Sequence, residues 1–354
     1  MPKSLMKGNE ALAKGAILGG CTHFFGYPIT PQNEIPEFLA RELPKTGGIF
    51  LQAESEIAAI NMVYGAAAAG GRPMTSSSSP GIALMQEGIS LLAAAELPSV
   101  IVNVQRGGPG IGTIQPSQCD YFQMTRGGGN GDYSIIALAP STAQESAEMM
   151  IDAFELAQRY RTPVFIVSDG MLGQMMEPVT MPSKVPQQSV KKDWAAVGHD
   201  NRRPPITIKT LALDPCDLEQ INLRLQEKFM RIRESESRYE TYRISEAELI
   251  FCGYGSVGRI LKNSVDQLRH EGVRVGLLRV KTLWPFPVEA FNVLPPRCRH
   301  ILSTEMNCGQ MIDDVRLAVN GKIQVTHYGR PGGIIPTPEE LADHAKNILA
   351  GGCQ

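Results

Sequence analysis

Hydrophobic and polar positions along the first 180 residues follow a pattern in which short apolar runs are separated by longer stretches of helical periodicity. The apolar runs predict strands at 48–51, 100–104, 135–138 and 163–167. The longer stretches predict helices at 9–18, 31–41, 54–69, 81–95 and 141–159. Strands that alternate with helices in this way predict a parallel sheet that is covered by helices on both faces.

The pattern changes after residue 182 and resumes near residue 246. The intervening segment contains prolines and paired basic residues, followed by a charged amphipathic stretch at 217–242. Beyond it, apolar runs predict strands at 248–252, 273–278, 300–304 and 323–328, with helices at 258–271 and 309–319. We therefore predict an α/β domain at 1–182, a linker with a long surface helix at 183–245, and a smaller α/β domain at 246–354.

Composition and charge favour a globular protein over a membrane protein or a nucleic acid-binding protein. The chain has 354 residues, 43% of them hydrophobic, and a net charge of -2, which is typical of a globular protein that binds small molecules. No basic stripe favours nucleic acid as a partner, and no apolar run approaches the roughly 20 residues that cross a membrane. The N-terminal segment has no continuous apolar core of the kind found in signal peptides, so we expect a cytoplasmic protein.

The cysteines argue against metal centres in this chain. Seven cysteines are scattered along the sequence without a C-x-x-C pair. That spacing disfavours a disulfide framework, a zinc site and an iron–sulfur cluster, because such clusters need closely spaced thiolates. We therefore expect any electron-transfer cluster to lie on a partner protein.

A glycine-rich turn, Gly253-x-Gly255-x-x-Gly258, follows one predicted strand and opens a helix, as in dinucleotide-binding folds. The acidic residue that would hold the ribose near the end of the next strand is missing, and Arg279 and Lys281 stand there instead. Glycines also serve simply to make tight turns. We favour that second role.

Residues Tyr27, Pro28, Ile29, Thr30 and Pro31 form a loop that two prolines stiffen before a predicted helix. Thr30 presents a hydroxyl group immediately before that helix. An N-cap is the commoner role for such a threonine, whereas contact with a ligand is the alternative.

Acidic residues follow the next predicted strand, where Glu54 and Glu56 open an alanine-rich helix. Carboxylates in a first helical turn often only complement the helix dipole at a solvated surface. However, residues 57–70 contain no charged side chain, so we expect this helix to be buried nearly all round. A carboxylate at the mouth of a buried helix indicates a functional group.

Arg106 stands at the carboxyl end of the predicted strand at 100–104, where open α/β sheets bind their ligands. Its planar guanidinium suits a substrate carboxylate, although a surface salt bridge is the alternative role. Glycines directly after it would let the backbone approach a ligand closely. Gln118 and Asp120 follow in the same loop region.

Together these segments resemble the alpha subunit of the 2-oxo acid:ferredoxin oxidoreductases, and the resemblance extends over nearly the whole chain. Within that family the sequence is most similar to the branched-chain type, which acts on 3-methyl-2-oxobutanoate, and next to the 2-oxoglutarate type. The motifs that carry the resemblance are the loop at 27–31, the acidic segment at 54–56, the serine run at 75–81, residues 105–109 and residues 118–120.

The resemblance implies a thiamine diphosphate pyrimidine-binding, transketolase-like domain followed by a smaller transketolase C-terminal-like domain. It implies that Glu56 is catalytic and binds a pyrimidine ring nitrogen of the cofactor, while Thr30 and Arg106 bind the substrate. The further cofactor-binding residues that it implies are Tyr27, Pro28, Ile29, Gln118 and Asp120.

The implied reaction is the coenzyme A-dependent oxidative decarboxylation of a 2-oxo acid, with electrons passed to ferredoxin. The family binds diphosphate and Mg²⁺ through a Gly-Asp-Gly stretch with a later asparagine, and residues 168–170 match it only in part. No metal ligand is therefore expected in this chain. We expect a beta subunit to carry the diphosphate and Mg²⁺ site, with iron–sulfur clusters on partner subunits. The further expected partners are a gamma subunit, ferredoxin or a ferredoxin-like delta subunit, and a second copy of this chain.

Two other functions remain open at this point. One is an NAD-binding dehydrogenase that uses the Gly253 turn, and the other is a non-catalytic scaffold that keeps only the fold. The substrate is open as well: a second arginine in the pocket would favour the dicarboxylate 2-oxoglutarate, whereas an apolar pocket would favour branched chains. Arg126 is the candidate for that second arginine.

Overall fold

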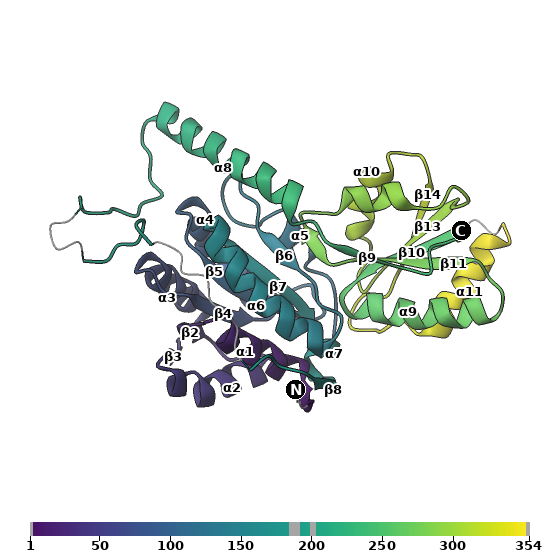
Figure 1. Ribbon diagram of the computed structural model, residues 1–354, viewed down its shortest axis with the longest axis horizontal. Helices are drawn as coiled ribbons and strands as arrows, with labels where there is room; N and C mark the ends of the chain where they lie inside the picture. Colours follow the sequence, from purple (N-terminus) through teal and green to yellow (C-terminus); the bar gives the residue numbers. More distant parts are fainter. Residues whose placement is uncertain (1–2, 184–191, 199–202, 352–354) are drawn as a thin grey trace.

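The computed structural model describes residues 3–183, 192–198 and 203–351, and two β-sheets organise this part of the chain (Figure 1). The larger sheet has the strand order β12-β6-β7-β5-β4-β2-β3, and all its neighbouring strands are parallel except β12, which runs antiparallel to β6. Its strands are β2 (His23–Gly26), β3 (Ile49–Gln52), β4 (Pro73–Ser77), β5 (Ser99–Gln105), β6 (Ile136–Leu138), β7 (Pro163–Asp169) and β12 (Thr282–Trp284).

Helices cover both faces of this sheet, because the side chains of a strand alternate between its two faces. In β5, Ile101 packs into the core under α3 (Glu56–Ala68) and α4 (Ser79–Ala94). Its neighbours Val100 and Val102 pack into the opposite core, under α1 (Gly8–Leu18), α2 (Glu34–Glu42) and α6 (Ala143–Tyr160). The predicted α/β class and the parallel sheet covered on both faces are confirmed.

The smaller sheet has the order β14-β13-β10-β11-β9, with β9 antiparallel to β11 and the other pairs parallel. Its elements are β9 (Tyr239–Tyr242), β10 (Leu249–Tyr254), α9 (Gly255–His270), β11 (Val275–Val280), β13 (His300–Glu305), α10 (Met311–Val319), β14 (Gln324–Gly329) and α11 (Pro338–Leu349).

The long surface helix is shorter than the sequence pattern predicts. Helix α8 (Pro215–Ser235) ends well before residue 242, and Tyr239–Tyr242 forms β9 instead. Aromatic and β-branched residues favour strands, and β9 satisfies its backbone by pairing with the edge of β11. Parts of the predicted linker, residues 184–191 and 199–202, lie outside the described residues.

Shorter elements complete the fold. Strands β1 (Ser4–Lys7) and β8 (Met176–Val179) pair antiparallel, and α5 (Tyr121–Thr125), α7 (Gly170–Gln174) and two 3₁₀ helices, Pro44–Thr46 and Val288–Val293, lie in the connections. Among the residues that the structure describes, no helix combines the length and apolar character needed to cross a bilayer.

Helix α3 departs from the prediction that it would be buried nearly all round. Ile60 and Val63 are buried against the sheet and α4, but Ile57 is 52% exposed, and Asn61 and Gly65 are exposed on the same face. The helix packs on β2, β4 and α4, and the face with Ile57, Asn61 and Gly65 points away from them (Figure 1). An uncharged helix face left open in this way is typical of a subunit interface.

The two sheets are tied together by buried polar contacts. Arg279 of β11 donates to both carboxylate oxygens of Glu145 on α6, at 2.6 and 2.9 Å, and to Glu240 of β9. Burial by itself would raise the pKa of Glu145, but the hydrogen bonds from Arg279 outweigh it and lower that pKa to about 2. Strand β12 strengthens the connection, because it returns from the second half of the chain to pair with β6.

Candidate active site

Four neighbouring parallel strands, β5, β4, β2 and β3, end at the same edge of the larger sheet. The four segments that the sequence analysis selected follow these strands directly. Residues 27–31 follow β2, residues 53–56 follow β3, Ser78 and Ser79 follow β4, and Arg106 follows β5. The topology therefore gathers segments that are up to 79 positions apart in the chain at the edge where parallel sheets bind ligands.

Glu56 begins helix α3, and its side chain is buried although it carries a carboxylate. Ser55 caps the helix by accepting a hydrogen bond from the amide of Ala58 at 3.1 Å. A Cβ atom built on Gly81 of α4 would lie 2.7 Å from Glu56 Oε1, so only a glycine leaves room for this carboxylate. Among the described residues, no side chain or backbone group hydrogen-bonds to the Glu56 carboxylate. The Glu56 oxygens are not among the fully buried polar atoms, so they keep a small opening through which a ligand can reach them.

Three hydroxyl groups in and directly after β4 are buried without a partner in the described part of the chain. Thr75, Ser77 and Ser78 are fully buried, and their side-chain oxygens have no hydrogen-bond partner within the described chain. Ser77 Oγ lies 2.1 Å from the position that a Cβ on Gly81 would take, so it borders the same space as Glu56. In the sequence these hydroxyls belong to a serine run and have no individual role. Their only sequence signal is a polar run in place of an apolar strand.

Arg106 is 7% exposed and braces two loops. Its guanidinium donates to the carbonyl oxygens of Thr30 and Ile111, at 3.0 Å each, while Nε–H is buried without a partner. The surface salt bridge considered from the sequence is wrong, since Arg106 is buried and forms no ion pair with a described residue. A guanidinium has five N–H donors, so one N–H on each of Nη1 and Nη2 remains for a carboxylate.

A hydrogen-bonded chain behind Arg106 fixes its backbone. Ser79 Oγ accepts from the amide of Arg106 at 3.1 Å and donates to Asp120 Oδ2 at 2.5 Å. The same carboxylate oxygen accepts from Asn103 Nδ2 at 2.9 Å. Burial raises the pKa of Asp120, and the hydrogen bonds from Ser79 and Asn103 oppose that rise. Ser79 was not selected from the sequence, because a serine in a serine run carries no individual signal.

Gln118 lies at the contact between the two sheets. Its side-chain Nε2 donates to the carbonyl of Tyr254 at 3.0 Å, and its Oε1 accepts from the amide of Met306 at 3.1 Å. Both ends of the amide are therefore engaged with the backbone of the second half of the chain. In this way Gln118 anchors the loop that carries Asp120.

The loop after β2 faces outward. Tyr27, Pro28 and Thr30 are exposed, and Ile29 is partly buried. The N-cap role considered for Thr30 is wrong, because α2 begins at Glu34 and Asn33 occupies its N-cap position. Thr30 instead lines a cavity of about 460 Å³, to which the C-terminal segment contributes Ile335.

A second cavity, of about 670 Å³, lies between the halves of the chain. Ser79, Asp120 and Ile111 line it from the first half, and Asn307 and Gln310 line it from the second. The loop at 107–111, which Arg106 braces, borders this cavity as well. The segments that carry Thr30, Arg106 and Asp120 therefore all border open space.

The glycine turn at Gly253 does not form a nucleotide site. Gly255 faces the side chains of Gln118 and Asp169, whose nearest atoms lie 3.2 and 3.9 Å from a Cβ built there. The side chain of Arg279 occupies the space beside Gly258. The turn is therefore covered by the first half of the chain, which leaves no room for a pyrophosphate and argues against the dehydrogenase hypothesis.

Two protein-family models match the chain. Residues 14–243 match the family described as pyruvate flavodoxin/ferredoxin oxidoreductase, thiamine diphosphate-binding. Residues 247–341 match the family described as pyruvate:ferredoxin oxidoreductase core domain II.

Curated relatives match over nearly their full lengths. The chain is 47% identical to the ketoisovalerate oxidoreductase subunit VorB of Methanothermobacter marburgensis, over 94% of each protein. It is 38% identical to the 2-oxoglutarate synthase subunit KorA of Methanothermobacter thermautotrophicus, over 95% of this chain and 96% of that one.

Solved structures share the fold. The 2-oxoglutarate:ferredoxin oxidoreductase of Magnetococcus marinus, solved with 2-oxoglutarate, coenzyme A and succinyl-CoA, matches with a TM-score of 0.87 and 29% identity. The match covers 98% of this chain and 65% of that longer chain. A split-gene transketolase matches with a TM-score of 0.61 at 14% identity, which shows a shared fold only.

Proposed function

This chain belongs to the 2-oxoacid:ferredoxin oxidoreductase family, and we propose that it supplies the pyrimidine-binding half of a thiamine diphosphate site shared with a second subunit. The reaction is the coenzyme A-dependent oxidative decarboxylation of a branched-chain 2-oxo acid, with ferredoxin as electron acceptor. The observation that carries the proposal is the carboxylate of Glu56, which is 7% exposed, accepts no hydrogen bond from a described residue and shares the space beside Gly81 with Ser77 Oγ.

The donors and acceptors at Glu56 fit an aminopyrimidine ring. Thiamine diphosphate, when bound, supplies an electron-accepting thiazolium ring for the decarboxylation. Glu56 holds a proton on a pyrimidine ring nitrogen, and its burial strengthens that hydrogen bond by excluding water. We place Ser77, which shares the space beside Gly81 with Glu56, near the polar edge of the same ring, and the loop at 27–29 on its other side.

Arg106 receives the substrate carboxylate through the N–H groups that its loop contacts leave free. Thr30 stands next to it and offers a hydroxyl to the 2-oxo group. Ser79 and Asp120 keep the backbone of Arg106 in place, so the guanidinium can orient the acid without moving itself.

The position of Arg126 bears on the choice of substrate. Arg126 pairs with Asp314 at 2.9 Å and packs over the ring of Phe122, so it serves the contact between the two halves of the chain. A single arginine together with the apolar side chain of Ile111, which lines the cavity between the halves, suits a branched monocarboxylate such as 3-methyl-2-oxobutanoate. The VorB relatives are named for this acid under its synonym ketoisovalerate. The alternative is the dicarboxylate 2-oxoglutarate, for which the KorA relatives are named.

The site needs a partner to be complete. The relatives are named as subunits, and the exposed face of α3 around Ile57, Asn61 and Gly65 lies on the helix that Glu56 begins. A beta subunit that docks there supplies the diphosphate and Mg²⁺ site. The gamma subunit and ferredoxin, or a ferredoxin-like delta subunit, belong to the same assembly, which works in the cytoplasm. Within this chain we place the domain boundaries near residues 182 and 245.

Replacement of Glu56 by glutamine tests the proposal. We expect Glu56→Gln to reduce 2-oxo acid-dependent viologen reduction by the reconstituted complex roughly 100-fold or more, because proton transfer of this kind contributes 10²–10⁴-fold. Retained thiamine diphosphate, measured after gel filtration, should fall as well.

Glu54→Gln is the matched control, since Glu54 lies two positions away and is exposed. That variant should keep normal turnover and normal cofactor content. Undiminished turnover of Glu56→Gln would falsify the proposal. It would instead support the scaffold hypothesis.

A further inference from the structure

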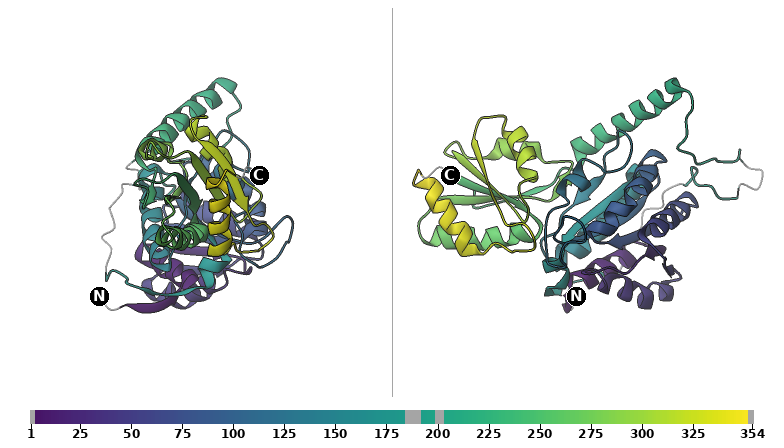
Figure 2. Two further views of the ribbon diagram at one scale, coloured as in Figure 1. Left: turned by 90° about the vertical axis from the view of Figure 1, so that its right-hand side faces the viewer. Right: turned by 180° about the vertical axis from the view of Figure 1, so that it is seen from behind.

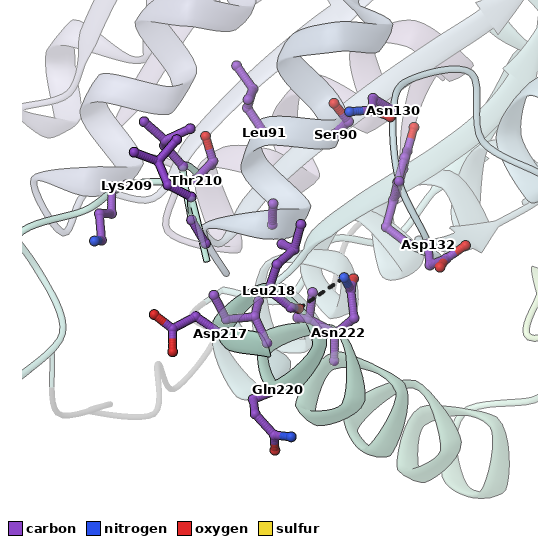
Figure 3. Close-up of a pocket in the computed structure, with 18 of the residues that line it drawn as sticks. Ser90, Leu91, Asn130, Asp132, Lys209, Thr210, Asp217, Leu218, Gln220 and Asn222 are labelled. Atoms are coloured by element: carbon purple, nitrogen blue, oxygen red, sulfur yellow. Dashed lines mark hydrogen bonds between the residues drawn. The ribbon is translucent and has the colours of Figure 1, made fainter. Parts of the chain in front are cut away.

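A third cavity lies away from the candidate active site, between α4 and the beginning of α8 (Figure 3). Its volume is about 680 Å³, and the segment at 209–213 closes it from one side. Figure 3 shows Leu91 of α4 and Leu218 of α8 on opposite walls of this cavity. The apolar residues that line it are Leu91, Ala94, Leu211, Ala212, Leu213, Leu218, Ile221 and Leu225. We refer to these walls as the α4–α8 groove.

The outer wall of the groove, formed by the segment before α8 and the first turns of α8, is exposed to solvent. The segment that leads into α8 and the first turns of this helix stand away from the body of the molecule (Figures 1 and 2). Leu213 is 86% exposed, Leu211 is 65% exposed, and residues 215–220 are exposed on all sides. Short helical segments are marginal in water without a packing surface. Large apolar side chains on such a segment indicate that another protein covers it.

The charged side chains around the groove are mostly acidic, which favours a partner segment with basic side chains. Glu87, Asp132 and Asp217 are among its lining residues, whereas Lys209 is the single basic one. No lysine or arginine occurs between residues 210 and 223 of the sequence. An apolar segment flanked by lysine or arginine side chains is therefore the complementary occupant.

The groove is continuous with the candidate active site along α4. This helix begins at Ser79 and carries Gly81 against Glu56, and its later residues Leu91 and Ala94 line the groove. Leu84 between them is 53% exposed, and Glu87, one turn further on, is exposed as well. A protein that covers the Glu56 end of α4 can therefore extend along this exposed stripe into the groove.

We propose that the α4–α8 groove binds an apolar helix, flanked by basic side chains, of the same subunit that completes the thiamine diphosphate site. This inference rests on the proposed function, because that function requires such a subunit. The segment at 203–213 and the first turns of α8 then form an arm that holds the partner against α4. The groove lies away from the reacting atoms. It therefore contributes to the binding of the partner subunit but takes no part in catalysis.

The test weakens the arm and leaves the active site intact. We expect the double variant Leu213→Glu, Leu218→Glu of the full chain to raise the Kd for the partner subunit at least roughly tenfold, as loss of anchor residues at an interface does. At saturating partner concentration kcat should be unchanged. The control is Leu317→Glu on α10, because Leu317 is 73% exposed and lies far along the chain from the groove. Its Kd should match that of the wild type.

The Kd of the double variant decides whether the groove binds the partner subunit. A double variant that binds its partner as tightly as the wild type overturns the inference, and so does one that instead changes only the self-association of the isolated chain. If thermal melting shows that the double variant folds poorly, the single variant Leu213→Glu repeats the measurement at the more exposed position. Tight binding by the arm variants together with an inactive Glu56→Gln would reject the groove alone. Weak binding together with an active Glu56→Gln would reject the proposed function, and the groove would then be a subunit contact unrelated to a thiamine diphosphate site.

Discussion

Arg106 shows how one side chain can serve structure and ligand binding together. Its Nη1 and Nη2 each donate one N–H to the carbonyl groups of Thr30 and Ile111, while the second N–H of each stays available to a ligand. A lysine has a single ammonium group and could not reach both loops and a carboxylate.

We therefore expect Arg106→Lys to raise the KM for the 2-oxo acid by roughly 10- to 100-fold, as several lost charge-assisted hydrogen bonds imply. Steady-state kinetics of the reconstituted complex measures this value. Arg126→Lys is the comparison variant, and its KM should stay close to the wild-type value because Arg126 pairs with Asp314 instead. An unchanged KM in Arg106→Lys would contradict the role of Arg106 in substrate binding.

Gly81 controls the space for Glu56. A methyl group at this position would lie 2.7 Å from Glu56 Oε1 and 2.1 Å from Ser77 Oγ, so both side chains would have to move. We expect Gly81→Ala to lower the affinity for thiamine diphosphate by at least roughly tenfold. A tenfold change in Kd corresponds to a loss of only about 1.4 kcal/mol of binding free energy, which a displaced Glu56 can cause. Isothermal titration of the complex gives the affinity. Gly198→Ala is the control, because a Cβ there meets nothing within 4 Å.

At the scale of the element, α3 carries a glycine that its own chain does not explain. Gly65 lies within the helix on its exposed face, and a Cβ built there has no atom within 4 Å. Glycine inside a helix costs about 1 kcal/mol relative to alanine. The beta subunit that we propose on this face gives a reason for the glycine, because a residue without a side chain permits a close approach.

Gly65→Ala should therefore act in opposite directions on the isolated chain and on the complex. We expect the free energy of unfolding of the isolated chain to increase by roughly 0.5–1 kcal/mol, because alanine is the better helix former. Partner association should weaken. Chemical denaturation measures the stability of the isolated chain, and a binding titration measures the association with the partner. Stronger association by the variant would contradict the idea that a partner packs against Gly65.

Elements also show where the sequence pattern was insufficient. Strands β2 and β4 were not predicted, although they carry the loop at 27–31 and the serine run. Strand β2 is only four residues long, and in β4 the buried positions Thr75, Ser76 and Ser77 are polar. A polar run does not signal a buried strand, because such residues become buried only where tertiary contacts or ligands satisfy them.

At the scale of the whole molecule, the pair between Glu145 and Arg279 couples the two sheets. Burial would raise the pKa of Glu145, but Arg279 lowers it to about 2, below its ordinary value of 4.5. A lowered carboxylate pKa stabilises the folded state above the ordinary pKa, and this contribution is lost as the pH falls toward the folded-state value.

We expect Glu145→Gln to lower the Tm by roughly 3–6 °C at pH 7. The difference between variant and wild type should shrink as the pH is lowered from about 4.5 toward 2. Differential scanning calorimetry over that range checks both statements. A Tm difference that stays constant with pH would show that the ion pair is not its cause.

The sequence by itself determined the fold class, most of the elements and the family, because hydrophobic periodicity and local motifs are properties of neighbouring residues. It also selected Thr30 from a proline-stiffened loop, Glu56 from the start of an uncharged helix, and Arg106 from the end of a predicted strand. Only the tertiary structure decided which buried groups lack a partner, that Arg126 and the Gly253 turn serve the contact between the sheets, and that one face of α3 stays open. These properties depend on residues far apart in the chain, which the order of strands in the sheets brings together.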